Sequence, residues 1–451
     1  MQKLIPVWLL LLCLLLGAVS TVMFGWSVKT GRPARFGLGD AAVAVASFPD
    51  MVQRTFKQVR SDPDSKIRVP RTSADLKEFV AMKVRPGIDL QGLMVRADQA
   101  AVARASGWRI LVGAFTIEGQ LKNAALALSP ELEIVHVWLL EQDIEGKKTP
   151  PGRVFPHGFA MLSDGSIIYS FDMGSSLQRV DRCGKRIWSV GGPFGHAVSL
   201  DDDERYAWVL KDYMDGVLGE VNRVATATGE VVRRITMDDI IAANPSVDIL
   251  EIRRKDDNWV TGNPRRTTDD WLDDPFHTND VEPLPAAIAD RFAGFEAGDL
   301  LISARSLNLV FVLDPDTLEI KWWRTGPWRR QHDPDWQPTG EITVYDNQMN
   351  RDYSRIVGIH PASQETRVVF DGRINDFYSR IRGKHQVTAA GNLLITSSQQ
   401  GRIFELDENG QVAFEIYNTK PGSDKFNYPL SEAIWFPTDA FDFAKDSSCK
   451  N

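Results

Sequence analysis

The chain has 451 residues, with 52 Lys or Arg against 60 Asp or Glu, which gives a formal net charge of −8 at pH 7. This acidic balance argues against a nucleic-acid-binding protein, which usually carries a basic domain or stripe. Hydrophobic residues make up 43% of the chain, as in globular proteins, and its three cysteines form no CxxC motif, which argues against a zinc ribbon or a disulfide scaffold.

The first predicted element is a membrane helix. Residues 4–26 contain no charged side chain, and at about 1.5 Å per residue they are long enough to span a bilayer. We predict a transmembrane or signal-anchor helix over residues 1–30, in preference to a cleaved signal peptide. The count of basic residues on either side leans toward a cytoplasmic body. The acidic body and the export-like start favour an extracytoplasmic, periplasmic one, and we predict the latter.

Residues 31–105 are predicted to form a short juxtamembrane neck of linker and helices. A basic linker comes first, and an Ala- and Val-rich helix follows it. A second helix has Pro49 in its first turn and places Val52, Phe56 and Val59 on one face. This face is expected to pack against the membrane or against the body.

From about residue 107 the chain changes character. Short β-type runs alternate with turn dipeptides, and no long amphipathic helix separates them, which is typical of an all-β array. Five segments share a leading histidine, a turn six to eight residues on and a β-run; they open at His157, His196, His277, His332 and His385. A sixth unit, without the leading histidine, fits residues 107–140.

Six such units predict an all-β, six-bladed β-propeller over residues 106–442, with an insertion at 238–276 and a tail at 443–451. The C-terminal run at 432–436 reads as one more strand. We expect it to pair with the first blade and close the ring, which removes exposed strand edges.

Histidines at one position of every blade fall on a ring around the channel. They either cap their inner strands or line an axial site, and we favour the axial site. Imidazole can act as a nucleophile, a general acid or base, or a metal ligand. Because Asp280 and Asp333 lie close to the histidines in sequence, a metal site stays an alternative, but we predict neither a metal nor a cofactor.

Arginine and asparagine side chains are the candidates for holding an anion. Arg305 and Arg355 lie in strand-like contexts, and a guanidinium offers a planar fork to sulfate or phosphate oxygens. Asn279 and Asn347 add neutral donors. Since the whole chain is acidic, an anionic ligand requires a local cluster of such groups.

These motifs resemble those of the arylsulfate sulfotransferase family, which are six-bladed propellers of the bacterial periplasm. The resemblance is loose over 107–440 and closer over 275–415; it rests on the stretches FHTNDVEPLP, GDLLISARSLNLVFVLDPDTLEIKWW, QHDPDWQPTGEITVYDNQMNRDYSRIV and GNLLITSSQQGRIFELDENG. It implies that a channel histidine takes a sulfuryl group from an aryl sulfate and passes it to a phenol. It also implies which residues hold the sulfate: His277, Asn279, His332, Asn347 and Arg355.

The sequence departs from the family at the nucleophile. That histidine would lie inside the unit spanning 385–417, but 391–414 contains none, so His385 is the nearest substitute. We therefore predict His332 and His385 as catalytic residues. The predicted substrate-binding residues are His277, Asn279, Arg305, Asn347 and Arg355. The expected partners are a sulfated aryl compound or phenol and, through the N-terminal helix, a membrane, but no nucleic acid.

Two other expectations stay open beside the enzyme. A non-enzymatic scaffold or glycan-binding propeller could use exposed aromatic residues; the candidates are Trp322, Trp323, Trp328 and Trp336. A quinone-dependent dehydrogenase is disfavoured, because the chain has no vicinal cysteine pair. We do not predict the family's periplasmic disulfide, since Cys13 lies in the membrane segment and only Cys183 and Cys449 remain.

Overall fold

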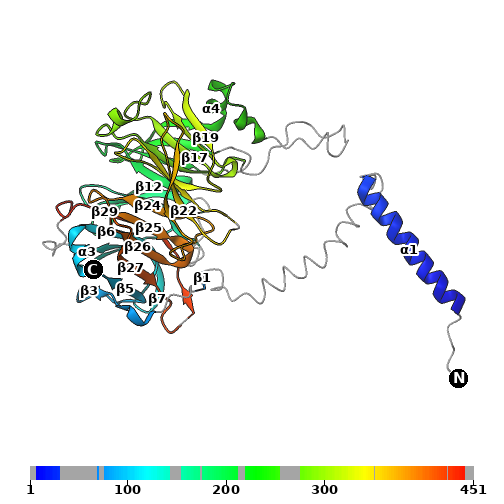
Figure 1. The fold of residues 1–451 in the computed structure, drawn as a ribbon, viewed down its shortest axis with the longest axis horizontal. Coiled ribbons are helices and arrows are strands. Elements are labelled where there is room, and N and C mark those ends of the chain that lie inside the picture. Colours follow the sequence, from blue (N-terminus) through cyan, green and yellow to red (C-terminus); the bar gives the residue numbers. More distant parts are fainter. Residues whose placement is uncertain are drawn as a thin grey trace. The chain divides into compact units, whose positions relative to one another are not determined.

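The computed structural model describes residues 7–30, 69–70, 76–142, 154–172, 175–211, 219–253, 275–349, 351–423 and 425–441. The chain divides into two compact units, and one of them spans Ile67–Arg254 and Trp271–Asn451. This β-rich unit contains all the described strands (Figure 1).

The other unit contains α1 (Val7–Thr30), which forms where the sequence predicts a helix. Among the described residues, however, no helix combines the length and the apolar character that crossing a membrane requires. The predicted membrane-spanning helix is therefore not supported. The predicted neck helices of residues 40–60 lie outside the described residues.

Two sheets of the β-rich unit have four antiparallel strands each, paired in chain order. The first contains β16 (Thr278–Pro283), β17 (Leu300–Ala304), β18 (Leu309–Leu313) and β19 (Ile320–Thr325). The second contains β20 (His332–Trp336), β21 (Ile342–Asp346), β22 (Arg355–Ile359) and β23 (Thr366–Asp371).

A third sheet has seven strands: β9 (Pro156–Met161), β10 (Ile167–Phe171), β11 (Ser175–Val180), β12 (Arg186–Leu200), β13 (Tyr206–Lys211), β14 (Glu220–Ala225) and β15 (Val231–Thr236). Its middle strand, β12, pairs with β11 through its first half and with β13 through its second half. The sequence divided this region into two units at His196. Hydrogen bonding instead gives five large sheets in the described part of the chain rather than six, because β12 runs continuously through both units.

Two sheets of six strands complete the arrangement. One contains β2 (Val80–Ala81), β5 (Leu93–Ala97), β27 (Val412–Asn418), β26 (Arg402–Leu406), β25 (Leu393–Ser397) and β24 (Lys384–Val387). The other contains β29 (Leu430–Phe436), β6 (Trp108–Ile117), β7 (Gln120–Leu128), β8 (Glu133–Leu139), β3 (Lys83–Val84) and, against β6, β4 (Leu90–Gln91). A small two-stranded sheet pairs β1 (Val69–Pro70) with β28 (Phe426–Asn427).

The sequence correctly predicted how the ring closes. The C-terminal strand β29 pairs antiparallel with β6, so that Ile434 lies opposite Ile110. The segment predicted as a helical neck differs, because residues 80–97 form short strands that extend two of the sheets. In β5, Leu93 and Val95 are buried while Arg96 is exposed, which is the alternation of a strand.

Among the described residues of the β-rich unit helices are few; they are α3 (Gln99–Arg104), α4 (Met237–Ala243) and the 3₁₀ turns η3 (Leu76–Glu78), η4 (Asp248–Arg253), η5 (Ala289–Arg291), η6 (Arg305–Leu307) and η7 (Ser398–Gln400). The helix α4 begins at a capping box in which Thr236 and Asp239 bond each other's backbone. Together with η4 it occupies the start of the predicted insertion and packs Met237 and Ile240 onto the core.

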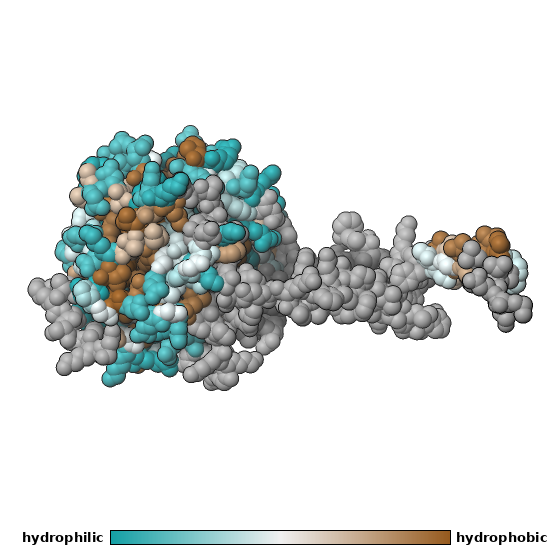
Figure 2. All heavy atoms as spheres, turned by 90° about the horizontal axis from the view of Figure 1, so that it is seen from below, coloured by the Kyte–Doolittle hydropathy of each residue, from teal (hydrophilic) through white to brown (hydrophobic). Residues whose placement is uncertain are grey.

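Each sheet is covered by apolar neighbours on both faces. In β6, Leu111 packs in one hydrophobic cluster while Ile110 and Val112 pack in another. This stacking of sheets side by side is the propeller-like arrangement that the sequence predicts. Figure 2 shows one face of the β-rich unit, on which hydrophobic residues lie together near the centre and hydrophilic residues surround them.

Trp328 and Trp336 are buried, so they are not available to stack on a glycan, whereas Trp323 is 42% exposed.

Candidate functional site

The predicted histidines lie where the inner strands are irregular. The pairing register shifts at Gly195–Val198 in β12, at Thr278–Asp280 in β16 and at His332–Pro334 in β20. His196 and His277 have positive φ angles of 63° and 47°, which non-glycine residues adopt rarely. Such bulges redirect side chains locally. They explain why histidines from different sheets converge.

Four histidines from four inner strands form what we call the histidine group: His157, His196, His277 and His332. The rings of His157 and His196 have centroids 4.5 Å apart, and those of His196 and His277 are 4.9 Å apart. The Nε2 atoms of His196 and His277 are separated by 3.2 Å. Four of the five histidines expected on the channel ring thus lie together, whereas His385 lies apart from them.

His332 is held in one tautomer by Asn347. The amide nitrogen of Asn347 donates to the backbone oxygens of Ser379 and Arg382, at 2.9 and 2.6 Å, which fixes the orientation of the amide. Its oxygen lies 2.7 Å from Nδ1 of His332 and can only accept, so Nδ1 carries the proton. Nε2 of His332 therefore keeps its lone pair and accepts the backbone N–H of Arg382 at 3.2 Å.

Arg382 connects the two ends of the histidine group. Its backbone N–H bonds His332. Its guanidinium pairs with Asp172 and lies 5.0 Å from the ring centroid of Phe155. Asp172 also approaches Nδ1 of His157 at 2.8 Å. Burial lowers the pKa of Arg382 to about 10, so it remains a cation at neutral pH.

The buried histidines remain neutral at pH 7. Burial lowers the pKa of His332 well below its ordinary value, the charge of Arg305 adds to this, and the bond to Asn347 opposes it. Burial also lowers the pKa of His157, with further contributions from His196 and Arg382.

Asn279 and Arg305, both predicted to bind substrate, lie beside the histidine group. The Asn279 amide donates to the backbone oxygen of Gln331 at 2.8 Å, and its own oxygen has no hydrogen-bond partner among the described residues. Arg305 follows β17, and its backbone N–H donates to the His277 oxygen at 3.1 Å. The charge of Arg305 is close enough to lower the pKa of His332.

Arg355 has different contacts from those expected of a sulfate-binding residue. Its Nε donates to Asp346 at 2.7 Å, and its Nη2 donates to the backbone oxygen of Pro327 at 2.9 Å. The Asp346 side chain is fully buried and neutralises the guanidinium. These described contacts tie Arg355 to the end of β21 rather than to the histidine group.

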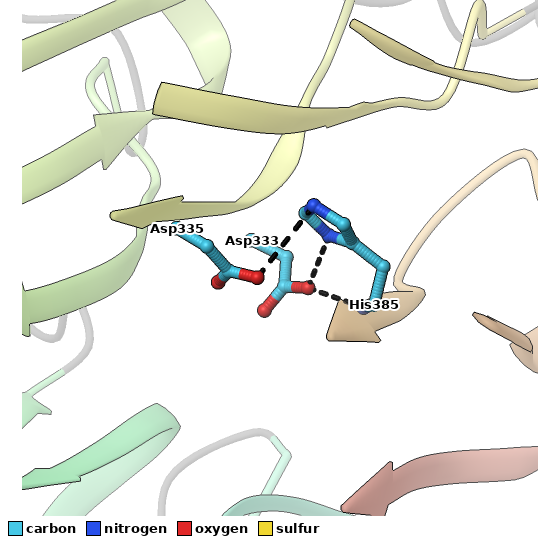
Figure 3. Close-up of side chains that lie close together, drawn as sticks. All are labelled: Asp333, Asp335 and His385. Carbon is cyan, nitrogen blue, oxygen red and sulfur yellow. Dashed lines mark hydrogen bonds and ion pairs between the residues drawn. The ribbon is translucent and has the colours of Figure 1, made fainter. Parts of the chain in front are cut away.

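His385 lies among carboxylates rather than histidines. Its backbone N–H and its Nδ1 both bond Asp333 (Figure 3). Its Nε2 lies 2.8 Å from the hydroxyl of Thr343. The carboxylate of Asp335 is 3.6 Å from the same Nε2. We call this neighbourhood the acidic group; its members are Asp280, Glu282, Asp333, Asp335, Lys384, His385 and Glu432.

Lys384 is the cation of the acidic group. Its Nζ lies 2.7 Å from Asp280 and 2.8 Å from Asp333. Burial acts to raise the pKa of Asp333, but Lys384 and the bonds from His385 outweigh burial and lower it to about 2. Burial raises the pKa of Glu282 to about 8, with Asp280 adding to the shift, and burial also raises that of Glu432 to about 8.

The acidic group faces a cavity of about 500 Å³, which His196 of the histidine group also lines. Apolar walls from several blades complete the cavity; among them are Phe159, Ile288, Trp336, Ile434 and Phe436. The two groups therefore meet at this cavity through His196. A negatively charged compound is favoured beside the histidines and a positively charged one beside the carboxylates.

The predicted catalytic and substrate-binding residues did not include several that the structure places at these sites; they are His157, His196, Asp172, Arg382, Lys384, Glu282, Asp335 and Glu432. Both histidines open predicted blades, and that shared position was the available signal. Arg382 and Lys384 belong to the basic run RIRGKH that precedes the last blade. A basic run at a blade opening was thus the signal for both cations.

Comparisons with known proteins bear on the same region. The family model described as Arylsulfotransferase (ASST) matches residues 158–419, more than half of the chain. No curated protein matches the chain significantly.

Solved structures with a similar course of the chain include a protein of unknown function from Bacteroides caccae. It is 15% identical, with a TM-score of 0.46, covering 71% of this chain and 97% of that one. TolB from Acinetobacter baumannii is 11% identical, with a TM-score of 0.45, covering 74% of this chain and 67% of that one. These similarities are too low to bear on function.

Proposed function

Because the chain belongs to the arylsulfotransferase family, we propose that it transfers a sulfuryl group from an aryl sulfate to a phenolic acceptor. The observation that carries the proposal is the histidine group, in which neutral buried imidazoles lie beside the cations Arg382 and Arg305. This combination provides both a nucleophile and charge for the sulfate oxygens, in a chain whose net charge is −8.

We assign the nucleophile to Nε2 of His332. Asn347 holds the proton on Nδ1, so the lone pair of Nε2 can attack sulfur. A nitrogen–sulfur bond then forms while the bond from sulfur to the aryl oxygen breaks, and the phenolate leaves. In the second step an acceptor phenol oxygen attacks sulfur, the nitrogen–sulfur bond breaks and His332 is regenerated, while the proton of the acceptor passes to the phenolate released in the first step. His385 is the weaker candidate, because the carboxylates around it would repel an aryl sulfate.

The backbone N–H of Arg382 has a defined part in this scheme. It bonds Nε2 of His332 now, so attack on sulfur requires that this bond be released. Once this bond to His332 is released, the N–H of Arg382 points toward an oxygen of the sulfuryl group, as the donors of an oxyanion hole do. The guanidinium of Arg382 and that of Arg305 supply positive charge to the other oxygens.

The experiment is sulfuryl transfer from 4-nitrophenyl sulfate to phenol by the purified full chain. We expect wild-type turnover and its loss in His332→Ala, by about 10³-fold or more. His360→Ala is the matched control, since His360 follows β22 and belongs to neither group. If the wild type fails to turn over any donor in a panel of aryl sulfates, the proposed activity is wrong.

We also propose that the β-rich unit is a ring of six blades. The count becomes six when β12 is divided at Phe194, the residue that pairs with both β11 and β13. The first and second halves of β12 then each complete a four-stranded blade. The ring places β9, the second half of β12, β16 and β20 around one axis, in agreement with the convergence of the histidine group.

We propose an extracytoplasmic location for the β-rich unit. Cys183 is disulfide-bonded, contrary to our sequence-based expectation, and disulfides persist mainly in oxidising compartments. Alkaline phosphatase fused to the C-terminus should be active in cells, because that enzyme folds only where disulfides form. An inactive fusion that accumulates as intact protein would contradict this location.

A further inference from the structure

Three side chains of the acidic group bring potential metal-ligand atoms together. One ligand atom each from Asp333, Asp335 and His385 lies within 4.8 Å of the others, and the three residues come from β20 and β24 (Figure 3). Asp333 and His385 are buried, and Asp335 is partly buried at the wall of the cavity. Burial distinguishes this cluster from carboxylates gathered on an exposed surface.

The hydrogen bonds of His385 fix its tautomer. Asp333 accepts from Nδ1 at 2.8 Å and from the backbone N–H, so Nε2 is the unprotonated nitrogen. A carboxylate that holds the second nitrogen of an imidazole in this way is the usual support of a metal-binding histidine. The lone pair of Nε2 accepts the hydroxyl proton of Thr343 at 2.8 Å, and the Thr343 oxygen accepts a bond from Gln337 at 2.7 Å, so an ion at Nε2 would replace that hydroxyl proton.

Asp335 is separated from that nitrogen by a distance that an ion would bridge. Its carboxylate oxygen lies 3.6 Å from Nε2, too far for a hydrogen bond. Two ligands placed about 2.1 Å from one ion lie roughly 3.0–3.5 Å apart at angles between a right angle and tetrahedral.

The surrounding charge favours a cation at the same place. Glu282 and Glu432 line the cavity beside Asp335, while the positive charge of Lys384 is directed to Asp280 and Asp333. A cation at this place would supply a counter-charge to Asp335 and would leave the pairing of Lys384 intact.

We propose that Asp335 and Nε2 of His385 bind a divalent metal ion at the wall of this cavity, with Asp333 positioning the imidazole and the Thr343 hydroxyl as a neighbouring oxygen donor. One imidazole with carboxylates suits ions that accept both nitrogen and oxygen, such as Mn²⁺. This site is separate from the histidine group. It does not depend on the proposed sulfuryl transfer.

The test is a titration of the chelator-treated full chain with MnCl₂, followed by the electron paramagnetic resonance signal of free Mn²⁺. We expect one ion bound per chain, with nitrogen coupling from one imidazole in the pulsed spectrum of the bound ion. Asp335→Asn should weaken binding by at least about tenfold, with its folding checked by thermal unfolding. The matched control is Asp202→Asn, whose carboxylate lines the same cavity but accepts the backbone N–H of Ala286 at 2.8 Å.

Four results would each overturn the proposal. They are no loss of the free Mn²⁺ signal, bound Mn²⁺ without nitrogen coupling, wild-type affinity in a folded Asp335→Asn variant, and equal weakening by Asp202→Asn. None of these depends on turnover. A failure of the sulfuryl-transfer assay would therefore leave the result for the metal site unaffected.

Discussion

The histidine group and the acidic group share two inner strands and yet have opposite electrical character. On β20, His332 belongs to the first and its neighbour Asp333 to the second; on β16, Asn279 lies beside the first and Asp280 belongs to the second. The first group has the cations Arg305 and Arg382, of which Arg382 is paired with Asp172, whereas the second holds five carboxyl groups against Lys384.

The difference shows how a bulged strand can serve two chemistries. In a regular strand adjacent residues point to opposite faces, so only alternate residues would reach the channel. The register shifts next to His332 and Thr278 allow neighbouring residues to contribute polar atoms to the channel side by side. The sign of the local field therefore changes within a few ångströms, independently of the net charge of the chain.

Removing the cation of the acidic group should have the largest effect on stability. Lys384→Met leaves Asp280 and Asp333 buried without their partner, and we expect the free energy of unfolding to fall by about 3–5 kcal/mol. Denaturant unfolding measures this. Adding Asp280→Asn to the variant should restore part of the loss. If the free energy of unfolding falls by less than about 1 kcal/mol, water or a local rearrangement of the chain stabilises the two carboxylates without Lys384. The electrical contrast between the acidic group and the histidine group would then be smaller than we infer.

Removing the cation of the histidine group should affect catalysis next. Arg382→Met eliminates a charge beside the reacting sulfur, and we expect the turnover number to fall by about 10²-fold with the fold retained. Arg373→Met is the control, because Arg373 forms an exposed pair with Asp371 on the surface. Turnover in Arg382→Met at the control level would exclude this cation from the reaction.

Much of the scaffold could be predicted from the sequence, because its signals are local. A histidine, a turn and a β-run recur at matching intervals along the chain. The closing strand at 430–436 shows the alternation of more and less buried residues that is typical of a strand. Single residues were harder. Arg355 has the sequence context of a sulfate-binding arginine, but the buried Asp346 on the adjacent strand pairs with it.

The division between the two groups could not be predicted, because it depends on bulges. A register shift of one residue decides whether His332 or Asp333 faces a given neighbour, and no composition signal marks it. Arg382 reaches the histidines from the loop before β24, so its role depends on a contact between segments 50 residues apart in sequence. The continuity of β12 across His196 was hidden for the same reason, since the sequence there shows glycines that usually end strands.

Asn347 should act on catalysis only through His332. Asn347→Leu removes the acceptor that fixes the Nδ1–H tautomer, and we expect turnover to fall by about tenfold. In a double-mutant cycle, the activity of His332→Ala/Asn347→Leu should equal that of His332→Ala alone. Independent, additive losses in that cycle would show that Asn347 acts elsewhere, for example by holding the loop of Ser379 and Arg382.

The smallest effect concerns the pH dependence of stability from the histidine group. The pKa of His157 is lowered in the folded state, chiefly by burial, while in the unfolded chain it is near 6.5. Below that value the unfolded state binds a proton that the folded state does not. The contribution of His157 to the free energy of unfolding is therefore complete above pH 6.5 and falls by up to about 1.4 kcal/mol per pH unit until the folded pKa is reached.

The raised pKa values of Glu282 and Glu432 act in the opposite sense, because their folded carboxyl groups hold protons that the unfolded ones release. The measurement is thus the difference between wild type and His157→Gln in denaturant unfolding from pH 7.5 to 5. That difference should change with pH by the slope of one histidine, and parallel curves would show that His157 titrates normally beside Asp172 and that the histidine group is not held neutral by burial.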